Sequence, residues 1–171
     1  MDRPKRKENR LPEYDYSQPG CYFVTVCTAN REPIFWTAEP TSTNHVGADI
    51  IRPLDRLSEY GRIVDESIRK IPAVYPLVQV DNYVIMADHI HLLLRIVGDG
   101  GRMISAPTKP LSTVIGQMKR AVTKRCGRPV WQKGCHDHVV RNDEDYRAAW
   151  AYIDNDPLQE REDRRWTTEE E

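Results

Sequence analysis

Residues 77–97, LVQVDNYVIMADHIHLLLRIV, hold two apolar runs that decide the fold. The runs Leu77–Met86 and His89–Val97 are rich in apolar and β-branched residues, which favours buried strands. Only Ala87 and Asp88 separate them, so the sequence predicts two neighbouring antiparallel strands. A glycine-rich cluster after Val97 ends the second strand.

The segments before this pair give one more strand and a helix. Residues 22–28 are β-branched and aromatic, which is typical of a buried strand. Residues 57–71 repeat apolar side chains at helical spacing, and Pro72 is expected to end that helix.

The segments after the pair predict a helix, a strand and a last helix. An amphipathic helix starts at Leu111, a short strand covers about residues 135–141, and the last helix runs from Asn142 or Asp143 to about Asp156. Pro157 is expected to stop it. This order predicts an α+β, ferredoxin-like split βαβ fold with an antiparallel sheet and an appended C-terminal helix.

The length of 171 residues suits one domain with a hydrophobic core. We expect residues 1–19 to form a polar arm, 20–157 the folded core and 158–171 an acidic tail. The chain holds no long apolar run and begins with a charged segment, so we expect a cytoplasmic protein that does not bind membranes.

The four cysteines show no C-x-x-C pairing, so reduced thiols are expected. A zinc site can be drawn from one set of residues, although its spacing matches no common pattern: Cys126, Cys135, His136 and His138.

Charge is distributed unevenly, although the net charge is only −1. Between Arg102 and Arg141 there are nine basic residues and one acid, Asp137, whereas residues 142–171 hold eleven acids and four arginines. A solvated helix face explains this pattern, and so does a nucleic-acid surface.

His89 and His91 stand two apart in a predicted strand, which sends both imidazoles to one face. Neutral imidazoles in such a pair can bind one divalent ion. Two partly exposed structural histidines would give the same pattern.

The last helix adds a phenol and a carboxylate, because Tyr152 and Asp156 stand one turn apart on one face. A different stripe is expected to pack on the sheet, which makes Tyr146 structural: Tyr146, Trp150, Ile153 and Pro157. An ordinary surface tyrosine and a helix-end acid remain the alternative reading.

These segments resemble a known family. Residues 83–94 (YVIMADHIHLLL) are similar to the His-hydrophobe-His signature of HUH single-tyrosine transposases, in the branch of REP-associated tyrosine transposases. Residues 14–28, 131–146 and 150–157 resemble the same branch, in the right order.

The resemblance implies that His89 and His91 bind Mg²⁺ or Mn²⁺ and that Tyr152 is the nucleophile. Asp156, where the family usually has Asn, is the candidate third ligand. Cleavage through Tyr152 would leave a 5′-phosphotyrosine and a free 3′-OH.

The basic segment is the expected surface for single-stranded or hairpin DNA. Six side chains are assigned to phosphates and two to unpaired bases: Lys119, Arg120, Lys124, Arg125, Arg128 and Lys133, then Trp131 and His136. A solvated helix face with a core Trp131 is the alternative.

Two other functions remain open at this point. One is a domesticated, non-catalytic nucleic-acid-binding protein, and the other is a metal-dependent RNA-processing protein on the same scaffold. The sequence leaves the oligomeric state, monomer or homodimer, undecided.

Overall fold

A computed structural model describes residues 14–37, 56–98 and 110–166, with side chains to Asp156. Arg102, Lys109 and most of the expected arm therefore lie outside the described residues. Tyr14 and Tyr16, from the end of that arm, pack against the core beside Tyr22.

Four antiparallel strands form one sheet: β1 (Gly20–Cys27), β2 (Val78–Ile85), β3 (His89–Ile96) and β4 (His136–Val140). Their order is β2-β3-β1-β4, so the first and third strands lie in the centre. This is the expected split βαβ arrangement, and the α+β fold class is confirmed.

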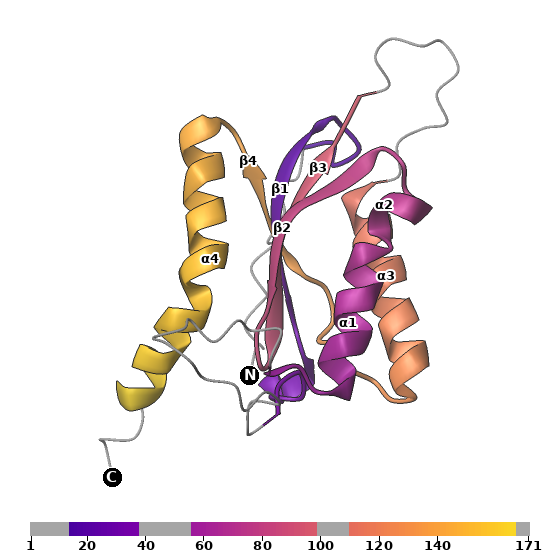
Figure 1. Cartoon of the computed structure of the whole chain (residues 1–171). Coiled ribbons are helices and arrows are strands. Elements are labelled where there is room, and N and C mark those ends of the chain that lie inside the picture. Colours follow the sequence, from indigo (N-terminus) through magenta and orange to yellow (C-terminus); the bar gives the residue numbers. More distant parts are fainter. Residues whose placement is uncertain (1–13, 38–55, 99–109, 167–171) are drawn as a thin grey trace, which may run out of the picture.

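The helices cover both faces of the sheet (Figure 1). One face carries α1 (Glu59–Arg69), the short α2 (Ile71–Val74) and α3 (Leu111–Cys126), and α4 (Asp143–Trp166) lies on the other face. A 3-10 turn, η1 (Ala29–Arg31), follows β1. No helix in the described ranges is long and apolar enough to cross a membrane.

The main core lies between the sheet and α1 and α3. Ile90, Leu92 and Leu94 of β3 point into it and are fully buried against Val114 and Val122 of α3. The α4 face has a smaller apolar cluster of four buried residues, Val84, Met86, Leu93 and Ile153. The side chains of β3 therefore alternate between a thick core and a thin one.

One of the two proline expectations needs correction. α1 ends at Arg69, ahead of Pro72 as expected, and Pro72 lies in the first turn of α2, where its missing N–H removes no helical hydrogen bond. Pro157 does not end α4, which continues to Trp166. Proline removes one hydrogen bond within a helix, and residues 158–165 are mostly strong helix formers, so the chain keeps its helical course.

Candidate metal centre and nucleophile

His89 and His91 lie on the α4 side of β3, on one face of the strand as the spacing predicted. Their Nε2 atoms are 3.1 Å apart, and their ring centroids are 4.7 Å apart. Ile90 points the other way into the main core, which fixes the strand's orientation. The two imidazoles therefore converge.

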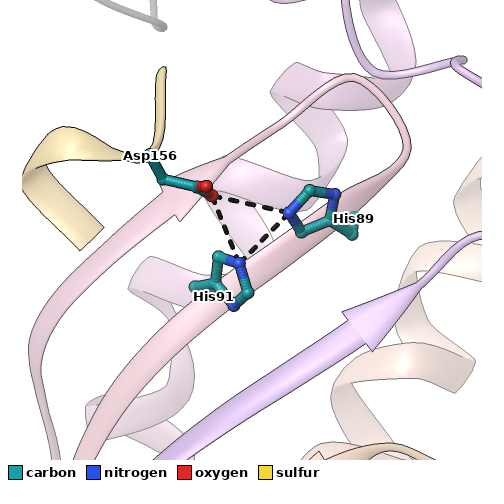
Figure 2. Close-up of side chains that lie close together, drawn as sticks. All are labelled: His89, His91 and Asp156. Atoms are coloured by element: carbon teal, nitrogen blue, oxygen red, sulfur yellow. Dashed lines mark hydrogen bonds and ion pairs between the residues drawn. The ribbon is translucent and has the colours of Figure 1, made fainter. Parts of the chain in front are cut away.

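Asp156 of α4 completes the group. Its Oδ2 lies 3.2 Å from His91 Nε2 and 3.5 Å from His89 Nε2 (Figure 2). The three ligand atoms lie within 4.8 Å of one another, and no other described His, Cys, Asp or Glu residues form such a group of three or more. Asp156 is buried, and its Oδ2 accepts no hydrogen bond of normal geometry from the described residues. An unsatisfied buried carboxylate oxygen is costly unless a cation meets it.

Polar partners behind the imidazoles fix their orientation. Asp88 Oδ1 lies 2.6 Å from His89 Nδ1, and Arg31 Nε in turn contacts Asp88 Oδ2 at 3.1 Å. Thr25 Oγ1 of β1 lies 2.8 Å from His91 Nδ1. Both Nδ1 atoms are thus occupied, which leaves both Nε2 atoms facing Asp156. Sequence reasoning missed Thr25, which is 66 residues from His91.

The protonation states follow from burial and from the carboxylates. Burial acts to lower the pKa of His89, but Asp156 and Asp88 outweigh it and raise this pKa to about 9. Burial lowers the pKa of His91, and the charge of His89 acts in the same direction. Burial acts to raise the pKa of Asp156, yet the two imidazoles hold it below its ordinary value. The raised pKa of His89 favours its protonated form beside the Asp156 carboxylate, and a bound cation would displace that proton.

Tyr152 stands beside this group. Its ring centroid is 5.2 Å from that of His91 and 5.8 Å from that of Phe23, edge-on in both cases. The side chain is 45% exposed, so it is accessible from solvent. The phenol and the three candidate ligands therefore share one site.

The face of α4 that meets the sheet differs from the predicted one. Ile153 is buried and Tyr146 is partly buried, as expected, but Trp150 is 38% exposed. Ala149 takes its place, so the buried stripe turns toward Asp156 and brings this carboxylate onto the sheet.

One solved structure supports this fold. A REP-associated tyrosine transposase, solved bound to a REP hairpin, matches with a TM-score of 0.59 and 20% sequence identity, over 88% of this chain and 73% of that chain. The chain has the fold of that REP-associated tyrosine transposase. A candidate transposase of Deinococcus radiodurans also matches, with a TM-score of 0.46 and 16% identity, over 85% of this chain and 97% of that one.

Sequence comparison adds one relative. An uncharacterised protein of Haemophilus influenzae is 28% identical, over 90% of this chain and 88% of its own length. No family model matches the chain.

A groove of about 820 Å³ runs between α3 and residues 129–135, and α3 lies on the opposite face of the sheet from α4. Ile115, Pro129 and Val130 contribute to its apolar lining. Five of the eight residues assigned to DNA line it: Lys119, Arg120, Lys124, Trp131 and Lys133. Arg125, Arg128 and His136 are not among its lining residues.

Several of the assigned side chains already have protein partners. Lys119 Nζ donates to the carbonyl oxygens of Gln132 and Gly134, both at 2.7 Å, which holds one wall of the groove. Arg125 pairs with Glu66 at 2.7 Å, and Arg128 with Glu32 at 2.6 Å.

The two residues assigned to bases lie in different places. Trp131 is partly buried against Phe35, with ring centroids 5.2 Å apart, so it contributes to the core as well as to the groove. His136 is exposed on β4 opposite Thr25, and paired residues of neighbouring strands share a face. His136 therefore lies on the same face as the candidate metal centre.

Proposed function

We propose that this protein is a metal-dependent DNA transposase that nicks and rejoins single-stranded or hairpin DNA through Tyr152. The observation that supports this is the convergence of His89, His91 and Asp156 beside an exposed tyrosine. The similar transposase is bound to a REP hairpin, which makes a DNA hairpin the first substrate to test.

The donor set fits a divalent cation. His89 and His91 would supply nitrogen and Asp156 oxygen, and a carboxylate oxygen suits Mg²⁺ or Mn²⁺. The buried Asp156 Oδ2 lies 3.2 and 3.5 Å from the two Nε2 atoms but accepts no hydrogen bond of normal geometry from the described residues, which supports this fit. When bound, such an ion would stabilise the negative charge that develops on the phosphate oxygens during cleavage.

Tyr152 would carry the covalent step. Its hydroxyl oxygen attacks the scissile phosphorus, and the bond from phosphorus to the 3′ oxygen breaks as the new bond forms. The phenol loses its proton and the leaving oxygen gains one, which gives a 5′-phosphotyrosine and a free 3′-OH. Because the ester preserves the phosphodiester energy, a second 3′-OH can attack it and rejoin the strand without ATP.

The groove beside α3 would hold the DNA backbone. The groove lies on the other face of the sheet from α4, and backbone hydrogen bonds join its edge to the end of β1: Gln132 N donates to Cys27 O, and the next residue, Thr28, donates its N–H to Asp88 O. Arg120 and Lys124 line the groove, are exposed and make no ion pair with any described residue. These two side chains are the best placed for phosphates.

Replacing Arg120 and Lys124 together by Ala is expected to weaken hairpin binding and reduce its salt dependence. The slope of log K against log salt should flatten by about 1.4, since each lost single-strand phosphate contact contributes about 0.7. Binding titrations at several salt concentrations measure this slope.

The matched control removes two charges that are already paired. Arg125→Ala with Arg128→Ala loses the same net charge, but Glu66 and Glu32 hold those guanidinium groups. The slope should change much less in this variant. Equal slopes in both double variants would mean that DNA phosphates do not contact Arg120 and Lys124 in preference to Arg125 and Arg128.

The proposed activity itself is tested with a labelled library of single-stranded hairpins in Mn²⁺. We expect a covalent protein–DNA band that resists denaturation and disappears with chelator. Hairpin binding without such a band, across the library, would instead indicate a non-catalytic nucleic-acid-binding protein.

A further inference from the structure

Strand β2 contains a β-bulge that faces α4. Val80 pairs with Leu94 of β3, but Asn82 pairs with Leu93, so Asp81 is an extra residue without a strand partner. Consecutive residues of a regular strand point to opposite faces. The bulge lets both Asp81 and Asn82 reach α4, because such an irregularity re-aims side chains.

Asp81 holds the first part of α4. Tyr146 Oη of the helix donates to Asp81 Oδ2 at 2.9 Å, and Arg95 of β3 donates to the same oxygen at 2.7 and 2.9 Å. The Arg95 guanidinium also lies 5.7 Å from the centre of the Tyr146 ring. This group fixes the helix ten residues before Asp156, a distance of about 15 Å along its axis.

Asn82 contacts α4 near the candidate metal centre, on the side of the helix opposite Tyr152. Its Nδ2 donates to Asp154 Oδ1 at 3.0 Å. Asp154 is two residues from Tyr152, about 200° around the helix, so this contact resists rotation that would move Tyr152 and Asp156. The apolar contact beneath α4 is small, with Ile153 its single buried apolar side chain among the described residues. Polar contacts therefore have a large share in setting the helix position.

We propose that the β2 bulge is a positioning device for the candidate metal centre. Asp81 and Asn82 anchor α4 through Tyr146 and Asp154, so that Asp156 meets His89 and His91 in the correct rotation. This inference rests on the proposed metal site, but it concerns residues that touch neither metal nor DNA. Tyr146, expected from the sequence to be structural, becomes a positioning residue.

The test measures Mn²⁺ affinity of the full chain by calorimetry, without DNA. Tyr146→Phe combined with Asn82→Ala removes both anchors and should weaken Mn²⁺ binding by about tenfold, the lower end of the effect of outer partners on metal sites. Tyr146→Phe alone should give a smaller loss. Asp81→Asn keeps an acceptor for Tyr146 and should retain more affinity than Asp81→Ala. Cleavage should recover at saturating Mn²⁺, because the ligands themselves remain.

Tyr83→Phe is the matched control on the opposite face of β2. The Tyr83 hydroxyl donates to Asp65 of α1 at 2.7 Å and accepts from Arg69 of α1 at 3.2 Å. Tyr146 contacts Asp81 and Arg95 in the same way, so the two tyrosines make equivalent contacts on opposite faces of the sheet. This variant should lose similar thermal stability and keep wild-type Mn²⁺ affinity.

The outcomes separate two failures. Equal Mn²⁺ affinities in Tyr146→Phe with Asn82→Ala, in Tyr83→Phe and in the wild type would overturn the positioning proposal and leave the metal site intact. A wild type that binds no Mn²⁺ would overturn the metal site, and the positioning proposal with it.

Discussion

Tyr152→Phe is expected to abolish strand cleavage and the covalent adduct while hairpin affinity stays nearly unchanged. The substitution removes only the nucleophilic oxygen, because the remaining ring can still pack edge-on against His91 and Phe23. Loss of a nucleophile that forms the covalent intermediate lowers the rate by at least about a thousandfold. Denaturing gels with labelled hairpin in Mn²⁺ measure the adduct, and filter binding in chelator measures the affinity.

Two other tyrosines serve as controls for the Tyr152→Phe prediction. Tyr83→Phe should form the adduct at the wild-type rate, since this residue faces α1 on the far side of the sheet. Tyr146→Phe should slow the reaction at limiting Mn²⁺ without abolishing it. An adduct that survives in Tyr152→Phe and is lost in Tyr146→Phe would transfer the role of nucleophile to Tyr146.

The histidine face was predictable because strand geometry leaves little choice. His89 and His91 are two apart in an apolar run, and the burial of Ile90 and Leu92 forces both imidazoles to the other face. The partner of His91 was not predictable, because Thr25 comes from a strand 66 residues away and is placed by register.

The rotation of α4 was harder to predict from sequence. Tyr146 and Ile153 fit a stripe that passes through either Ala149 or Trp150, and hydrophobicity alone favours the tryptophan. The structure uses Ala149, since a small side chain lets the helix approach the sheet and Asp156 enter the buried face. The choice depends on the polar anchors in β2, which no local pattern reveals.

The basic segment shows what charge counting misses. Lys119, Arg125 and Arg128 looked equivalent to Arg120 and Lys124 in the sequence, but their ammonium and guanidinium groups are already bound. The partners of Arg125 and Arg128, Glu66 and Glu32, lie 59 and 96 residues away along the chain. Contacts that form only in the folded chain therefore decide which Lys and Arg side chains remain available to DNA.

His91→Ala and His89→Ala are each expected to remove Mn²⁺-dependent cleavage, with a loss of about a hundredfold or more, since a bound metal contributes several kcal/mol of charge stabilisation. His138→Ala is the matched control, because His138 lies on β4, which β1 separates from β3, and pairs with Asp145 at 2.9 Å, outside the group of three. Calorimetry should show Mn²⁺ binding in the wild type and in His138→Ala but not in the other two variants.

In a crystal structure with Mn²⁺, both Nε2 atoms should lie about 2.0–2.4 Å from one ion. Cleavage that persists in His91→Ala, or an ion bound away from both imidazoles, would exclude this metal centre. Loss of Mn²⁺ binding in a folded His91→Ala variant would establish that His91 of β3 is a metal ligand.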